Sequence, residues 1–286
     1  MSRGGLTRIA LPFVVVISIV ALLTGCGNPP YPRGTLESLF PNDPKPQFSV
    51  VPLQGRPLSV ASVASTTATA QSPMLLFLHG SPGDWKAWSY FLRDPQLASY
   101  NQRLAVDRPG FGESQPGAIM PSLRQQAALL GALIPPGRKA IVVGHSLGGP
   151  LAAWLAIDFP DKVCAAVSIA GSLSSRYEAP RWYNHLAEWT VVQWVLPKEM
   201  VWSNREMMPL ATELQELETM WSQLRVPVVL LQGGKDSLVD PRTVNEVQAL
   251  APKSQLKVLV YPDESHFLLW EKPQLVVDAI RAVPCV

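Results

Sequence analysis

Short apolar runs alternate with amphipathic stretches along most of the chain. The runs lack polar alternation, as is typical of strands covered on both faces, and they span residues 74–78, 103–106, 140–143, 163–170, 226–231 and 256–260. Between them, apolar residues share helical faces: Leu123, Ala127, Leu130 and Ile134; Leu147, Leu151, Leu155 and Phe159; Val276, Ile280 and Val283. Strands that alternate with helices in this way predict an α/β fold with a mostly parallel, doubly wound sheet.

Two segments depart from this rhythm. Residues 48–53 and 58–63 alternate around a Gln-Gly-Arg-Pro sequence, which predicts a hairpin. Residues 172–224 are too many for one crossover, and their patterns are helical. We predict that they form a lid over the carboxyl ends of the strands, the edge where open α/β sheets bind ligands. The lid carries five tryptophans, which either line an apolar ligand pocket or pack the lid onto the core: Trp182, Trp189, Trp194, Trp202 and Trp221.

The N-terminus has the pattern of an export signal. Arg3 and Arg8 accompany an apolar stretch over residues 9–23 that is short for a membrane span and contains Pro12. The sequence Leu-Thr-Gly-Cys that ends at Cys26 resembles the lipobox of bacterial lipoproteins. That resemblance implies cleavage before Cys26 and lipidation of its side chain; an ordinary signal peptide or an uncleaved anchor is the alternative.

The lipobox divides the chain into three parts. We predict that residues 1–25 form the signal peptide, residues 26–46 a tether rich in Pro, Gly and Asn, and residues 47–286 the folded domain that includes the lid. The expected location is the bacterial cell envelope, with a membrane as partner through the lipid anchor. In a Gram-negative cell the residue after the cysteine, Gly27, favours the outer membrane or a periplasm-facing site.

Composition narrows the possible functions. Hydrophobic residues make up 47% of the chain and charged ones 16%, which provides for a large core, and a net charge of +2 gives no support to nucleic-acid binding. Histidines and carboxylates do not cluster at metal-ligand spacing, and no G-x-G-x-x-G opens a helix, so we predict no metal and no cofactor. Cys164 and Cys285 remain as free thiols or as a disulfide pair.

A G-x-S-x-G sequence places Ser146 between a buried run and an amphipathic helix. In that context the motif predicts a sharp strand-to-helix turn that lifts the serine hydroxyl to a helix N-terminus, where developing negative charge is favoured. The alternative is a serine in a glycine-rich turn that has no chemical role.

Together with two other loops, this motif resembles the α/β-hydrolase superfamily, and more narrowly its lidded esterase, epoxide-hydrolase and haloalkane-dehalogenase branch. The loops are His79-Gly80-Ser81-Pro82-Gly83 and residues 107–114, Asp-Arg-Pro-Gly-Phe-Gly-Glu-Ser. The resemblance covers about residues 46–283. It implies that the backbone N–H groups of Ser81 and Leu147 form an oxyanion hole. It also implies that the second loop braces the site, with Asp107 and Arg108 as a structural pair.

The base follows by elimination among four histidines. His145 is bonded to Ser146 and should point away from it, His79 should support the loop after its strand, and His185 lies in the lid. His266 remains, after the last strand, where the family places its catalytic histidine; Ser265 stands where glycine is common. A serine hydroxyl needs such a base, whereas dehalogenases and epoxide hydrolases of this fold attack with an aspartate.

Three aspartates compete as the acid that orients His266. Asp236 follows the run at 226–231, and the order nucleophile, acid, histidine is that of this fold. Asp263 shares the loop of the histidine, where a short tether hinders it from reaching behind the ring. Asp240, followed by Pro241, suits a helix N-cap. We therefore predict Asp236.

These residues predict a serine hydrolase that cleaves small, apolar carboxylic esters or related acyl compounds through an acyl-enzyme on Ser146, with Asp236 and His266 completing the triad. A carbon–carbon bond hydrolase or an acyltransferase could use the same residues. From another class of protein, a non-catalytic envelope-binding protein could retain the fold.

Overall fold

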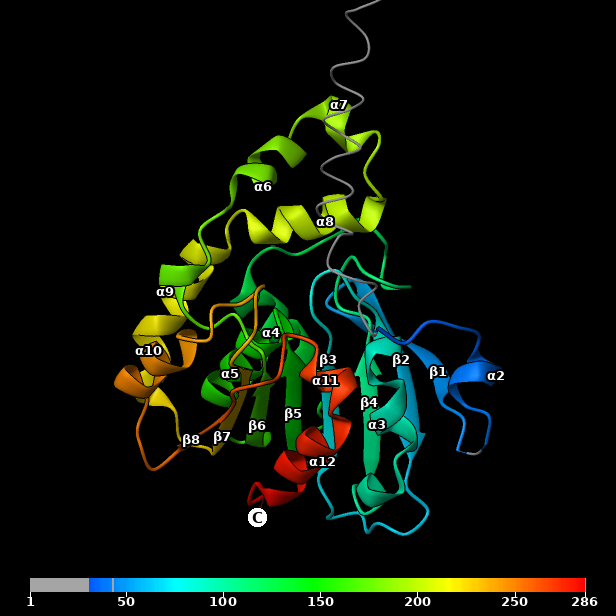
Figure 1. The fold of residues 1–286 in the computed structure, drawn as a ribbon. Coiled ribbons are helices and arrows are strands. Elements are labelled where there is room, and N and C mark those ends of the chain that lie inside the picture. Colours follow the sequence, from blue (N-terminus) through cyan, green and yellow to red (C-terminus); the bar gives the residue numbers. More distant parts are fainter. Residues whose placement is uncertain (1–30, 43, 286) are drawn as a thin grey trace, which may run out of the picture.

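The computed structural model describes residues 31–42 and 44–285, whose strands form one eight-stranded sheet (Figure 1). The predicted signal peptide and the predicted lipidation site, Cys26, lie outside the described residues. The order of strands across the sheet is β1-β2-β4-β3-β5-β6-β7-β8. The strands are β1 (Gln47–Leu53), β2 (Arg56–Ala64), β3 (Met74–Leu78), β4 (Gln102–Val106), β5 (Ala140–His145), β6 (Val163–Ile169), β7 (Val228–Gly233) and β8 (Leu256–Tyr261).

The sheet is parallel from β4 to β8 and antiparallel at its other end. β1 and β2 form the predicted hairpin, and Gln54 and Gly55 take positive φ angles of 47° and 79° at its two-residue turn. β2 also pairs antiparallel with β4, which then lies parallel to β3. The predicted mostly parallel α/β sheet is confirmed.

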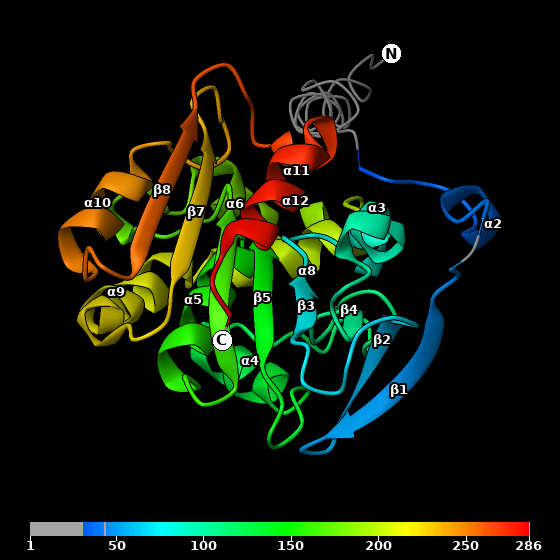
Figure 2. The ribbon, with the colours of Figure 1, turned by 90° about the horizontal axis from the view of Figure 1, so that it is seen from below.

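The side chains of each central strand contribute to two hydrophobic cores, one on each face of the sheet. In β3, Leu76 and Leu78 belong to the core under α4 and α5, whereas Leu75 and Phe77 belong to the core under α3 and α12. This is why the strand runs show no polar alternation. The helices of the two layers are visible on opposite faces in Figure 2. They include α3 (Ser89–Arg93), α4 (Leu123–Gly131), α5 (Gly148–Asp158), α10 (Thr243–Leu250), α11 (Leu268–Glu271) and α12 (Pro273–Ala282).

The helical insertion lies between β6 and β7, as predicted, and α6 to α8 extend beyond the carboxyl ends of the strands (Figure 1). It consists of α6 (Trp182–Ala187), α7 (Thr190–Gln193), α8 (Lys198–Met207) and α9 (Leu210–Met220), with short 3₁₀ turns at Ser175–Tyr177 and Trp221–Gln223. Trp221 is buried in the core beside α9. Trp182, Trp189 and Trp194 are 63%, 66% and 79% exposed, so packing onto the core accounts for only part of the tryptophan set.

The described part of the predicted tether is packed on the domain. Thr35 caps the short α2 (Leu36–Leu39), and Phe40 is fully buried in the core under α3. Tyr31 stacks edge-on against Trp270 and donates a 2.6 Å hydrogen bond to Asp84. These contacts differ from those of a free spacer, because the Phe40 ring is part of a hydrophobic core of the domain.

Cys164 in β6 and Cys285 after α12 form a disulfide across a separation of 121 residues. The bond joins the chain end to the centre of the sheet, which settles the pairing that the sequence leaves open. No helix within the described residues is both long and apolar enough to cross a bilayer.

Candidate active site

The turn between β5 and α5 is a tight elbow with Ser146 at its tip. Ser146 has a positive φ of 55°, an uncommon conformation for a residue with a Cβ. A Cβ on Gly144 would overlap the carbonyl of Gly148, so only glycine lets the strand and helix backbones touch here. Every residue from 140 to 157 is buried except Ser146, which is half-buried. The elbow therefore presents one side chain from an otherwise closed core.

Asp236 and His266 are joined by a buried hydrogen bond. His266 Nδ1 lies 2.8 Å from Asp236 Oδ2, and the two residues are 5% and 7% exposed. Asp236 Oδ1 also accepts the backbone N–H groups of Leu238 and Val239. Burial alone would raise the pKa of Asp236, but the hydrogen bond and charge of His266 and these amides hold it below its usual value. An ionised carboxylate only accepts, so Nδ1 carries a proton, and in the neutral imidazole the lone pair is then on Nε2.

The competing aspartates lie elsewhere. The Asp263 side chain is 87% exposed and pairs with Lys235 at 2.9 Å. Asp240 pairs with Arg242 at 2.7 Å and accepts its backbone N–H just before α10. Neither carboxylate contacts His266, so the structure brings together only Asp236 and His266 of these candidates.

Two supporting residues were missed by the sequence analysis. Gln232 Nε2 donates to Asp236 Oδ2 at 3.0 Å. Gln232 is the one polar residue in the otherwise apolar strand β7, and this is the sequence signal that could have identified it. His145 Nε2 lies 3.1 Å from the carbonyl oxygen of His266, and the two rings are 4.8 Å apart. Burial, reinforced by His266, lowers the pKa of His145 to about 3, so the neutral ring donates to this carbonyl. His145 thus supports the loop of the predicted base instead of pointing away from the site.

The loop after β3 lies against the elbow. A Cβ on Gly80 would come within 2.9 Å of Ser146 Cβ, so this loop contacts the predicted nucleophile closely. The amides of Ser81 and Leu147 donate to no acceptor within the described residues, and Leu147 precedes the N-terminus of α5. The Ser146 hydroxyl likewise has no hydrogen bond to His266 there; such contacts in unliganded sites often tighten only with substrate.

His79 holds this loop in the way its position predicts. The backbone N–H of Arg108 donates to His79 Nε2 at 2.9 Å, so Nδ1 must carry the proton and donates to Gly80 O at 2.7 Å. Burial, together with the charge of Arg108, keeps the pKa of His79 well below its usual value. The ring is neutral and serves as a brace.

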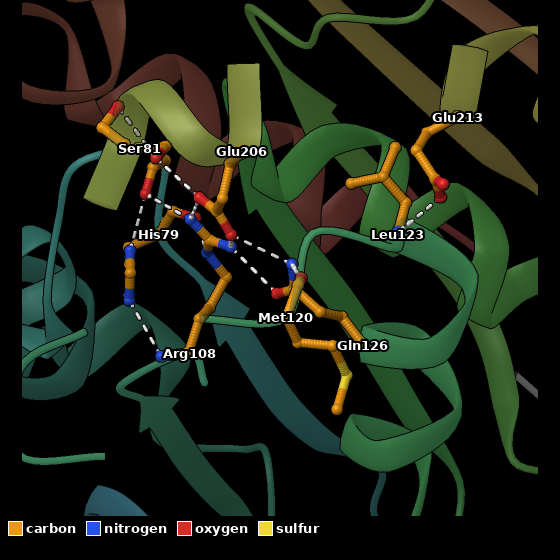
Figure 3. Close-up of polar contacts among 10 residues, drawn as sticks. His79, Ser81, Arg108, Met120, Leu123, Gln126, Glu206 and Glu213 are labelled. Atoms are coloured by element: carbon orange, nitrogen blue, oxygen red, sulfur yellow. Dashed lines mark hydrogen bonds and ion pairs between the residues drawn. The ribbon is translucent and has the colours of Figure 1, made fainter. Parts of the chain in front are cut away.

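The predicted pairing of Asp107 with Arg108 is wrong. Arg108 forms a bidentate ion pair with Glu206 of α8, with 2.8 and 2.9 Å contacts (Figure 3). Asp107 accepts the backbone N–H groups of Trp85 and Glu113 instead, and burial raises its pKa to about 6. The side chains of Asp107 and Arg108 therefore contact different neighbours, although the residues are adjacent in sequence. The counterion of Arg108 comes from the lid and not from Asp107.

A further carboxylate, that of Glu178, follows the 3₁₀ turn Ser175–Tyr177 after β6. Burial raises the pKa of Glu178 to about 7, with Ser172 and Arg181 opposing the shift and the charge of Asp236 adding to it. One of its oxygens is buried without a partner among the described residues. Because His266 already bonds Asp236, Glu178 is a neighbour of the acid and not its replacement.

Two cavities lie away from the predicted triad. One of about 360 Å³ lies between β7, β8 and α12, and a smaller one of about 60 Å³ lies among α6 to α8. Among the residues that the structure describes, no three His, Cys, Asp or Glu side chains are grouped as metal ligands.

The family model described as "Alpha/beta hydrolase family" matches residues 75–279. This range includes the elbow, Asp236 and His266. The chain belongs to the alpha/beta hydrolase family, and its mostly parallel eight-stranded sheet with flanking helices is the fold of that family.

Curated relatives match over shorter stretches. The chain is 37% identical over 98 residues to the dihydrolipoyllysine-residue acetyltransferase component of the acetoin cleaving system of Cupriavidus necator. It is 31% identical over 132 residues to epoxide hydrolase B of Mycobacterium tuberculosis, and 34% identical over 98 residues to the pimeloyl-[acyl-carrier protein] methyl ester esterase of Proteus mirabilis. These matches cover 34 to 43% of this chain and 26 to 36% of those proteins.

Among solved structures, a lipase-esterase related protein from Clostridium acetobutylicum is similar with a TM-score of 0.62. The two are 17% identical, and the match covers 79% of this chain and 99% of the other. A likeness at this identity concerns the fold.

The roles of the buried Asp236 and the exposed Asp263 can be distinguished by mutation. Asp236→Asn should lower turnover of a chromogenic acyl ester by about 10⁴-fold, because an amide no longer holds the proton of His266 on Nδ1. Steady-state kinetics on folded protein measures this.

Asp263→Asn is the matched control, since it removes an exposed carboxylate paired with Lys235. It should lower turnover by about tenfold or less, compared with about 10⁴-fold for Asp236→Asn. A crippled Asp263→Asn beside a nearly normal Asp236→Asn would show that the acid is misassigned.

Proposed function

We propose that the protein hydrolyses carboxylic esters or related acyl compounds through an acyl-enzyme on Ser146. The buried hydrogen bond between His266 Nδ1 and Asp236 Oδ2 carries the proposal. A buried imidazole held in one tautomer by an ionised carboxylate is the base that a serine hydroxyl requires. The elbow of the same sheet edge presents that hydroxyl.

In the proposed reaction, His266 Nε2 takes the proton of Ser146 as its oxygen attacks the acyl carbon. The resulting oxyanion accepts the N–H groups of Ser81 and Leu147, donors that are already fixed before charge develops. His266 then gives its proton to the leaving group. In the second half it activates water, which releases the acid and restores Ser146.

The relatives support acyl chemistry in part. Two of them are named for reactions of acyl groups, an acetyltransferase component and a methyl ester esterase. The third is an epoxide hydrolase, and epoxide hydrolases of this fold attack with an aspartate where this chain has Ser146. Carbon–carbon bond hydrolysis and acyl transfer remain alternatives with the same residues. A vinylogous diketone substrate and an added alcohol acceptor would distinguish them from ester hydrolysis.

The nucleophile is tested by covalent labelling. A fluorophosphonate probe should label the protein lacking residues 1–26 at Ser146, because among the residues that the structure describes this serine lies on the elbow at the same sheet edge as the Asp236–His266 pair. Peptide mass spectrometry locates the adduct. Labelling that persists unchanged in Ser146→Ala would refute the assignment.

We further propose that the protein is lipid-anchored through Cys26 in a bacterial envelope. Cys26 lies five residues before Tyr31, a reach of at most about 17 Å. Tyr31 packs on Trp270, whose ring lies 5.0 Å from that of His145, so the anchor would attach near the active-site edge. The disulfide suits an oxidising compartment, and the exposed tryptophans of α6 and α7 suit a membrane interface, where tryptophan is enriched.

Lipidation can be read directly from the mature protein. Cys26 should carry a diacylglyceryl group at the new N-terminus, and Cys26→Ser should release the protein from membranes or block its processing. Mass spectrometry of the N-terminal peptide provides the measurement. An unmodified Cys26 inside an intact leader would exclude the anchor.

A further inference from the structure

The lid reaches the predicted oxyanion loop through one buried carboxylate, that of Glu206 in α8 (Figure 3). Its side chain is 1% exposed and accepts four hydrogen bonds. Arg108 donates two of them, Gln126 donates one at 3.0 Å, and the Ser81 hydroxyl donates one at 2.6 Å. Residues of the core and of the loop after β3 thus donate to all four lone pairs of this lid carboxylate.

Arg108 transmits this contact to the backbone on which the oxyanion hole depends. All five guanidinium N–H groups have an acceptor: two on Glu206, and one each on Gln126, His79 O and Gly80 O. The two carbonyls belong to the residues immediately before Ser81. The planar fork therefore holds them in one orientation, and Glu206 supplies the negative charge opposite the buried guanidinium.

Ser81 is held a second time, by its side chain. Its hydroxyl lies 2.6 Å from Glu206 Oε2 and 3.1 Å from Ser203 Oγ, also in α8. The hydroxyl has one proton, and the short, charge-assisted contact assigns it to the carboxylate. Glu206 therefore fixes Ser81 in two ways: through Arg108 it holds the two carbonyls before Ser81, and directly it holds the Ser81 side chain.

We propose that Glu206 is a positioning residue that couples the lid to the oxyanion hole: its carboxylate fixes the N–H of Ser81 where the oxyanion forms. The coupling exists only while α8 is docked on the loop. The inference rests on the proposed function, because it assumes that Ser81 donates to the reacting acyl group. If the carboxylate only held the lid on the core, it would stabilise the folded protein without affecting the chemical step.

Two substitutions separate these roles. Ser81→Ala keeps the Arg108–Glu206 ion pair and the backbone N–H of residue 81, and removes only the hydroxyl. Glu206→Gln removes the charge at nearly constant volume. Each should lower kcat for 4-nitrophenyl butyrate by about tenfold or more with KM within about threefold, because a displaced oxyanion donor acts on the transition state.

Glu199→Gln is the matched control, an exposed glutamate of the same helix α8, and it should leave kcat and KM at wild-type values. Thermal unfolding of each variant is measured in parallel. If Glu206→Gln fails to fold, Ser81→Ala alone decides. A Ser81→Ala protein with wild-type kcat overturns the proposal while the proposed function stands. Absence of Ser146-dependent turnover in the wild type overturns both.

Discussion

The whole arrangement depends on the elbow that holds Ser146 at a φ of 55°. A left-handed conformation costs a residue with a Cβ about 1–2 kcal/mol, so the surrounding structure must impose it. It does so through close backbone contact: Gly144 meets Gly148 within the elbow, and Gly148 lies against Leu78 O at the end of β3. Because β5 lies between β3 and β6, the strained turn is fixed by the most buried part of the sheet.

Around this elbow, hydrogen bonds fix the positions of the charged side chains and the ring nitrogen on which each histidine carries its proton. His79 and His145 are held neutral by burial; His79 donates its N–H to the carbonyl of Gly80 in its own loop, and His145 donates to the carbonyl of His266. Asp236 stays ionised because His266 and two backbone amides bind it. Fixed dipoles and charges of this kind need no reorganisation when an oxyanion develops.

The sequence predicts those features that local chemistry determines. The run at residues 74–78 matches β3 because a strand covered on both faces must be apolar throughout. The residues flanking Ser146 specify the elbow, and the chain order singles out Asp236 and His266. Contacts that depend on the path of the lid were not predictable: Arg108 and Glu206 are 98 residues apart, and no local pattern pairs them. The burial of Phe40 was missed for a similar reason, since a single aromatic ring in a Pro-rich segment has no periodic neighbour.

The proposed mechanism requires an acyl group to be bound covalently to Ser146. Rapid-quench reaction with 4-nitrophenyl butyrate, followed by peptide mass spectrometry, tests this directly. We expect a burst of one nitrophenolate per protein and a butyryl mass on the peptide that contains Ser146. Turnover without such an adduct, or an adduct on Asp236 or any other side chain, would contradict the mechanism.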